Sequence, residues 1–172
     1  MTSAHLVRRF FAAIRTSEPR EEDTDWTQAL LSPQERPLFD RLPAHDRRHA
    51  IAVATAVETE LGEGCEKRWL VVALLHDIGK QQADLSVVER AFATIPILFI
   101  GRQKVGRWTA GYCGRVGKYA RHGEIGAEEL RAAEGSEDAA AWSEAHHNAR
   151  QTWAALGWPD EVIRALDAAD NA

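Results

Sequence analysis

The chain of 172 residues has few cysteines, no long apolar run and no internal repeat. Its two cysteines, Cys65 and Cys113, form no CxxC pair, which argues against a disulfide framework or a cysteine zinc site. No apolar run approaches the roughly 18 residues that a membrane-spanning helix needs. The N-terminal residues also lack the apolar core of a signal peptide. We therefore expect a cytoplasmic protein without a transmembrane segment.

Basic residues are in the minority. The chain has 21 lysines and arginines against 26 aspartates and glutamates, which gives a net charge of −5. A protein that coats DNA or RNA over its whole surface needs the opposite balance, so no nucleic-acid partner is expected. The length suits one domain over residues 1–172.

Strand-like alternation is almost absent, and the apolar spacing predicts helices instead. Residues 48–61 follow the helical period up to Gly62, which is expected to end that helix. The apolar run 69–75 fits either a buried strand or a buried helix, and its charged lead-in favours the helix. We predict an all-α fold that begins with a helical extension and a polar loop over residues 1–31.

Three residues mark expected helix starts. Ser32 precedes Pro33 and has a glutamate three positions later, which is the pattern of a capping box. Ser136 is an expected N-cap because acidic residues follow it, and Pro159 is expected to open the last helix.

Residues 95–121 interrupt the helical pattern. An apolar run, 95–100, is followed by a glycine-containing stretch, 101–121, that has six basic residues and no acidic one. Three interpretations remain open for this insertion: a flexible connection between helices, a flap that attracts an anionic substrate, or a lipid-facing element.

The seven histidines are the unusual feature of the composition. His76 and Asp77 directly follow the apolar run 69–75, where a charged aspartate is costly to bury unless it is paired or binds a metal. Imidazole and carboxylate together suit Zn, Mn, Fe or Ni, and aspartate also accepts Mg. His5 and His45 are expected at the surface.

Four further groups share the apolar stripe of a predicted helix: His49, His122, His146 and Asp170. Each lies three, four, seven or eight residues from apolar residues of its helix, which places it on the buried side. A single inward histidine is more often a core residue than a ligand. Several such groups, with two carboxylates among them, predict a metal site.

The order of these residues resembles that of the HD superfamily of metal-dependent phosphohydrolases. His49, the sequence HDIGK at residues 76–80, and Asp170 carry the resemblance, which covers about residue 40 to residue 172. It implies an all-α bundle, the HD domain, with the basic glycine-containing segment 95–121 as an insertion.

Two more segments are similar to the multinuclear branch of that superfamily. Residues 122–126 resemble its His-x-x-x-Gly segment, and His146 and His147 resemble its paired histidines. This ligand set is like that of HD-GYP cyclic-dinucleotide phosphodiesterases and of HD-fold di-iron oxygenases. Residues 148–150 read Asn-Ala-Arg where HD-GYP enzymes have Glu and Gly-Tyr-Pro, so specificity for cyclic di-GMP has no support.

The resemblance implies a site with one or two divalent ions. Iron or manganese is favoured, and Mg, Co, Ni or Zn is possible. Asp77 would be shared by both ions. The other implied ligands of the first ion are His49, His76 and Asp170, and those of the second are His122, His146 and, as a ligand or a substrate contact, His147.

Further residues are candidates for work on the substrate. Lys80 lies one turn after Asp77 and could contact a phosphate, or be a solvated surface lysine. Asp84 is a candidate for proton transfer to the leaving group. The basic residues closest to His122 in the insertion are expected to meet an anionic substrate first: Arg115, Lys118 and Arg121.

The leading functional hypothesis is a phosphohydrolase. It would act on a nucleotide, a cyclic nucleotide or another small phosphate ester through a metal-activated water. The first alternative is an HD-fold di-iron oxygenase, because the same ligand order supports it. The second is a non-enzymatic HD module that binds a metal or ligand.

Overall fold

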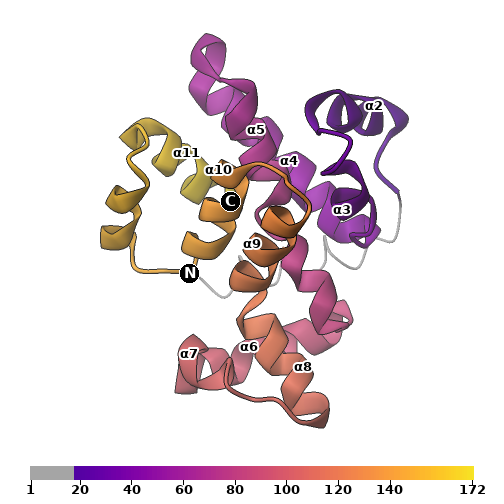
Figure 1. Ribbon diagram of the computed structural model, residues 1–172, viewed down its shortest axis with the longest axis vertical. Coiled ribbons are helices and arrows are strands. Elements are labelled where there is room, and N and C mark those ends of the chain that lie inside the picture. The colour runs from indigo at the N-terminus through magenta and orange to yellow at the C-terminus, as the bar shows by residue number, and fades with distance from the viewer. Residues whose placement is uncertain (1–17) are drawn as a thin grey trace.

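The computed structural model describes residues 18–172, which form helices and no strand (Figure 1). The all-α prediction is therefore confirmed for this part of the chain. The predicted extension before residue 18, with His5, lies outside the described residues. The polar loop expected before residue 31 is largely helical, because Glu21–Leu30 form α2. The three acidic residues in the first turn of α2 stabilise the helix, because they interact favourably with the positive end of its dipole.

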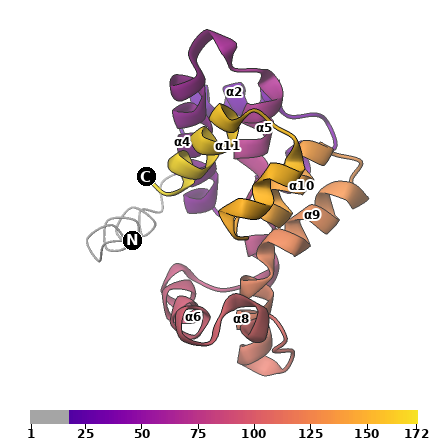
Figure 2. The ribbon, with the colours of Figure 1, turned by 90° about the vertical axis from the view of Figure 1, so that its left-hand side faces the viewer.

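A bundle of helices surrounds α5 (Lys67–Leu75). Its residues 69–75 are all buried, as a helix that is apolar on every side requires. The prediction of helix over strand is thus confirmed. Two helices pack against α4 (Ala44–Leu61), namely α5 and α11 (Asp160–Asp170). The bundle is completed by α10 (Glu137–Ala145), which packs against α5 and against α9 (His122–Ala132) (Figures 1 and 2).

The expected caps are formed, with one shift. Ser136 Oγ accepts a hydrogen bond from the Ala139 amide at 3.2 Å, and Pro159 directly precedes α11. Ser32 and Glu35 exchange the two capping-box hydrogen bonds, but Pro33 to Glu35 form a turn, and α3 (Arg36–Asp40) begins only at Arg36.

The insertion is helical, which argues against the first of the three interpretations, a flexible connection between helices. The apolar run ends α6 (Val87–Ile100), and α7 (Arg102–Val105) and α8 (Gly111–Ala120) follow. These helices protrude from one end of the bundle (Figures 1 and 2) around a small core of their own. A Cβ at Gly117 would lie 2.2 Å from the Trp108 carbonyl oxygen. The glycine there allows close packing rather than flexibility.

A buried ion pair joins this protrusion to the bundle. Arg90 of α6 donates from Nη1 to both carboxylate oxygens of Asp46, at 2.8 and 2.7 Å, and from Nε to the Leu85 carbonyl at 3.0 Å. Asp46 lies one turn before His49 on α4. His45 is also half-buried here rather than at the surface, with Nε2 3.3 Å from Arg90 Nη1.

Truncating one member of this pair is expected to destabilise the fold. Arg90→Ala leaves the buried carboxylate of Asp46 uncompensated, so the free energy of unfolding should fall by about 3 kcal/mol or more. Urea denaturation measures this change, and Arg41→Ala, at an exposed position, serves as the control. Equal stability of the two variants would contradict a structural role for the pair.

Candidate metal centre

The structure brings all seven candidate ligands together. They form two groups, and within each group the ligand atoms all lie within 4.8 Å of one another. One group contains His49, His76, Asp77 and Asp170, and the other contains Asp77, His122, His146 and His147. Asp77 belongs to both, so its carboxylate lies between two sets of donors.

Three of the histidines are oriented by the same backbone contact. His76, His122 and His146 each have Nδ1 2.7 Å from the carbonyl oxygen of the residue three positions earlier. A carbonyl oxygen only accepts hydrogen bonds, so Nδ1 carries a proton in each ring. Nε2 is thereby left to face the cluster, which is the arrangement of histidines that bind metals.

The Nε2 atoms converge on Asp77. His122 Nε2 lies 3.1 Å and His146 Nε2 3.7 Å from Asp77 Oδ1, and His76 Nε2 lies 3.2 Å from Asp77 Oδ2. Burial lowers the pKa of His122, and it lowers the pKa of His146 to about 3, so both rings are neutral. Their Nε2 lone pairs therefore face the lone pairs of a carboxylate.

The donor atoms fit a cation at this point. Asp77 Oδ1 and His146 Nε2 are buried without a hydrogen-bond partner in the described part of the chain. Buried polar atoms rarely remain unsatisfied in proteins. A metal ion would satisfy both atoms, and histidine with carboxylate is a donor set for Fe, Mn, Co, Ni or Zn.

The first group has a different charge balance. His49 Nε2 lies 3.1 Å and His76 Nε2 3.4 Å from Asp170 Oδ1. Burial lowers the pKa of His76, but Asp77 and Asp170 outweigh that effect and raise it to about 10. Burial opposes the charge on Asp77, yet His76 and Lys80 hold the pKa of that carboxyl well below its usual range. The protonated ring of His76 is then the counter-ion that a bound cation would replace.

Glycines allow the elements of the site to approach closely. Gly79 lies in η2 (Ile78–Ala83), directly after Asp77 and Ile78. A Cβ there would lie 2.0 Å from the His122 carbonyl oxygen, and one at Gly123 would lie 2.4 Å from the Ser143 carbonyl oxygen. The absence of side chains therefore lets α9 place His122 against Asp77.

Lys80 and Asp84 have different surroundings. Lys80 Nζ contacts Asp77 Oδ2, and its side chain is largely buried, so it is not a solvated surface lysine. Asp84 has a side chain that is 95% exposed, pairs with Arg115 at 3.5 Å, and lies outside both groups of donors.

A cationic pocket adjoins the second group. Its volume is about 660 Å³, and it includes His147. The charged residues in its lining are Arg102, Lys104, Arg107, Arg121 and Glu124. None of the four cations has an ion pair with another described residue, so their charge is available to an anion.

The pocket contains only part of the substrate-binding set that the sequence suggests. Arg121 and His147 line it, whereas Lys80, Arg115 and Lys118 do not. Arg115 instead approaches Asp84 and Glu89. Three pocket cations were not singled out by sequence reasoning: Arg102, Lys104 and Arg107. The sequence indicated only that residues 101–121 contain basic residues and no acidic one. That composition does not show which of the basic side chains line the same pocket.

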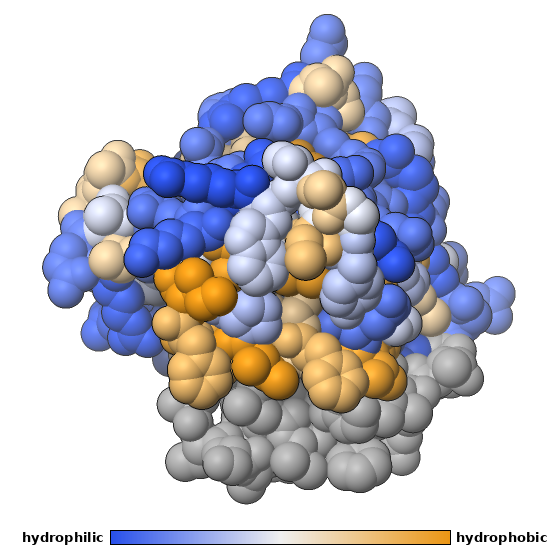
Figure 3. Space-filling model, turned by 90° about the horizontal axis from the view of Figure 1, so that it is seen from below, coloured by the Kyte–Doolittle hydropathy of each residue, from blue (hydrophilic) through white to orange (hydrophobic). Residues whose placement is uncertain are grey.

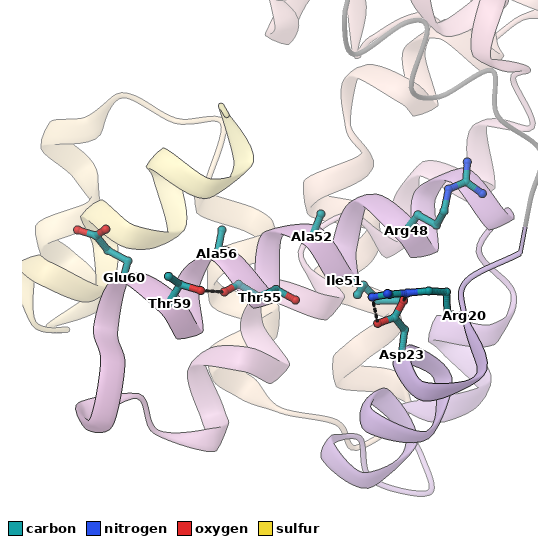
Figure 4. Close-up of a pocket in the computed structure, with 9 residues that line it drawn as sticks. All are labelled: Arg20, Asp23, Arg48, Ile51, Ala52, Thr55, Ala56, Thr59 and Glu60. Carbon is teal, nitrogen blue, oxygen red and sulfur yellow. Dashed lines mark hydrogen bonds and ion pairs between the residues drawn. The ribbon is translucent and has the colours of Figure 1, made fainter.

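A second cavity lies away from these groups. It has a volume of about 570 Å³ and follows the outer face of α4 from Arg48 to Glu60, with Arg20 and Asp23 at one end (Figure 4). None of the candidate ligands lines it. The pocket beside His147 is therefore the better candidate for a substrate.

Comparison with known proteins agrees with this geometry. The family model described as HD domain matches residues 47–171, which include every residue of the two groups. The match is to the HD domain in general and does not assign the HD-GYP branch. None of the curated proteins and none of the solved structures that were compared matches the chain.

Proposed function

This chain belongs to the HD domain family, and we propose that it is a metal-dependent phosphohydrolase whose two ions share Asp77. The observation that carries the proposal is the pair of donor groups with one common carboxylate, next to a cationic pocket. The substrate class is a small phosphate ester, such as a nucleotide or a cyclic nucleotide. Iron and manganese are the favoured metals.

Each donor group would hold one ion. His49, His76 and Asp170 would complete the first site, and His122, His146 and His147 the second, with Asp77 common to both. When bound, such ions lower the pKa of water and stabilise negative charge at phosphorus. The backbone contacts of the histidines fix the rings before a metal arrives, which reduces the cost of ordering them.

The remaining residues act on the anion. Arg102, Lys104, Arg107 and Arg121 give the pocket a positive field that attracts and orients a phosphate group. Lys80 Nζ beside Asp77 is a point charge that a phosphate oxygen could contact. Asp84 is exposed, pairs with Arg115 and belongs to neither donor group, so the geometry gives no support for proton transfer by this residue.

A substrate and metal panel tests the proposal. The purified chain is incubated with Mn, Fe, Mg, Co or Ni and with nucleoside monophosphates, cyclic nucleotides or p-nitrophenyl phosphate, and the ester bonds cleaved are quantified. We expect metal-dependent cleavage of at least one class. Oxygen consumption by the iron-loaded chain without ester cleavage would assign it to the di-iron oxygenases instead. Metal binding with neither reaction would favour a binding module.

The pocket cations are expected to determine substrate affinity. Changing Lys104, Arg107 and Arg121 to glutamine removes three charges from the pocket lining, so KM for an anionic ester should rise about tenfold at low salt, with kcat and metal content unchanged. The control changes Arg115 and Lys118 to glutamine, outside the pocket. Steady-state kinetics distinguish the two, and a larger effect in the control would show that the pocket is not the substrate site.

A further inference from the structure

One face of α6 is apolar and exposed to solvent. Val88, Phe92, Ile95 and Phe99 recur at helical spacing, and Leu98 and Ile100 extend the same surface. Phe92, Leu98 and Phe99 are 62%, 72% and 86% exposed. We call these six residues the α6 apolar face. Contiguous exposed apolar side chains of this size mark an interaction site.

The space-filling view shows these side chains together. Apolar residues gather in one patch on the end of the molecule that carries the protrusion, and hydrophilic side chains lie along the upper edge of the patch (Figure 3). The protrusion is convex, because α6, α7 and α8 extend from the bundle (Figures 1 and 2). A convex apolar helix suits a broad, deformable partner surface better than a peptide that needs a groove.

The positive charge of the protrusion indicates what kind of partner would bind the α6 apolar face. The sequence has no acidic residue between Glu89 and Glu124, and seven basic residues lie in that interval. The protrusion is thus strongly positive in a chain whose net charge is −5. Four of its cations are exposed and have no ion pair with another described residue: Lys104, Arg107, Lys118 and Arg121. The partner should be both apolar and anionic.

Two occupants from the chain itself are disfavoured by this charge. A second copy would bring an equally positive protrusion against the first. The N-terminal residues 1–17 contain Arg8, Arg9 and Arg15 and no acidic residue, so they too are positively charged. An anionic lipid bilayer has the required chemistry, because its phosphates attract the cations and its acyl chains accept the apolar side chains.

We propose that the α6 apolar face and the cations beside it bind the surface of an anionic lipid bilayer. The 14 residues of α6 extend only about 21 Å, and none of the described helices is long and apolar enough to cross a membrane. The helix therefore lies at the interface between headgroups and acyl chains. Ile100 belongs both to the α6 apolar face and to the lining of the cationic pocket. Docking would place that pocket at the lipid surface.

Vesicle sedimentation tests this proposal without reference to catalysis. The full chain is mixed with vesicles of phosphatidylcholine alone or of equal parts phosphatidylcholine and phosphatidylglycerol. We expect binding to the mixed vesicles at low salt, at least tenfold weaker binding to phosphatidylcholine alone, and loss of binding as salt rises. Equal binding to both vesicle types, or binding to neither, would overturn the proposal.

Matched variants locate the contact. Leu98→Gln with Phe99→Gln removes the two most exposed apolar side chains and should weaken binding to the mixed vesicles at least tenfold. Arg41→Gln with Arg164→Gln removes two exposed charges outside the protrusion and should retain most of the binding. Equal binding by the apolar variant and the wild type would overturn the proposal. So would a wild-type dimer in sedimentation equilibrium that this variant abolishes, because it would assign the face to a second copy.

Discussion

Replacing Asp77 by alanine is expected to remove metal from both donor groups at once. Asp77 is the one residue common to both groups, and its Oδ1 lies within reach of His122 and His146 while its Oδ2 faces His76. Without the carboxylate, each ion loses a ligand and the charge that offsets its own. Bound metal should fall from two ions per chain to less than one, and phosphate release should fall to the background rate.

Elemental analysis of the purified variant measures this loss. Asp77→Asn keeps the size of the side chain and should show the same loss, which separates ligation from packing. Asp25→Asn, on an exposed position of α2, is the control and should keep its full metal content. Circular dichroism checks that each variant is folded. Two ions per chain in folded Asp77→Ala would contradict the shared site.

The second large effect is expected at Gly79. A Cβ at this position would lie 2.0 Å from the His122 carbonyl oxygen and 2.6 Å from the Gly126 amide nitrogen, which are backbone atoms of α9. Neither atom can move without shifting the helix that carries His122. Gly79→Ala should therefore lower the free energy of unfolding by roughly 3 kcal/mol or more and reduce metal binding in the second group.

Urea denaturation and metal titration measure the two effects in the same preparation. Gly64→Ala is the matched control, because a Cβ there has no atom within 4 Å. We expect this control to resemble the wild type in both measurements. A Gly79→Ala chain as stable as Gly64→Ala would show that α9 does not pack against η2 as closely as described.

The grouping of the donors could be predicted because helical periodicity defines faces. His49 lies on the same side of α4 as Val53 and Val57, both buried in the core, and Asp170 follows Leu166 by one turn on α11. A residue on the apolar side of an amphipathic helix faces the common core, so several such helices bring their groups together. The resemblance to the HD superfamily supplied their order.

The cationic pocket could not be predicted in the same way. Its cations come from α7, from the turn after α7 and from the residue before α9. Their positions depend on how closely α8 approaches that turn, as the contact between Gly117 and the Trp108 carbonyl shows. Arg115 and Lys118 were predicted to bind the substrate because they are close to His122 in the sequence. In the folded protrusion, neither residue lines the pocket. The sequence likewise does not show which glycines lie at close helix contacts.

Anomalous diffraction from crystals loaded with manganese would show whether two ions share the Asp77 carboxylate. We expect two anomalous peaks per chain, one on each side of the Asp77 carboxylate, with one peak near His49 and Asp170 and the other near His122 and His146. Peaks confined to the protein surface, or no peak beside Asp77 in a crystal soaked to saturation, would contradict it.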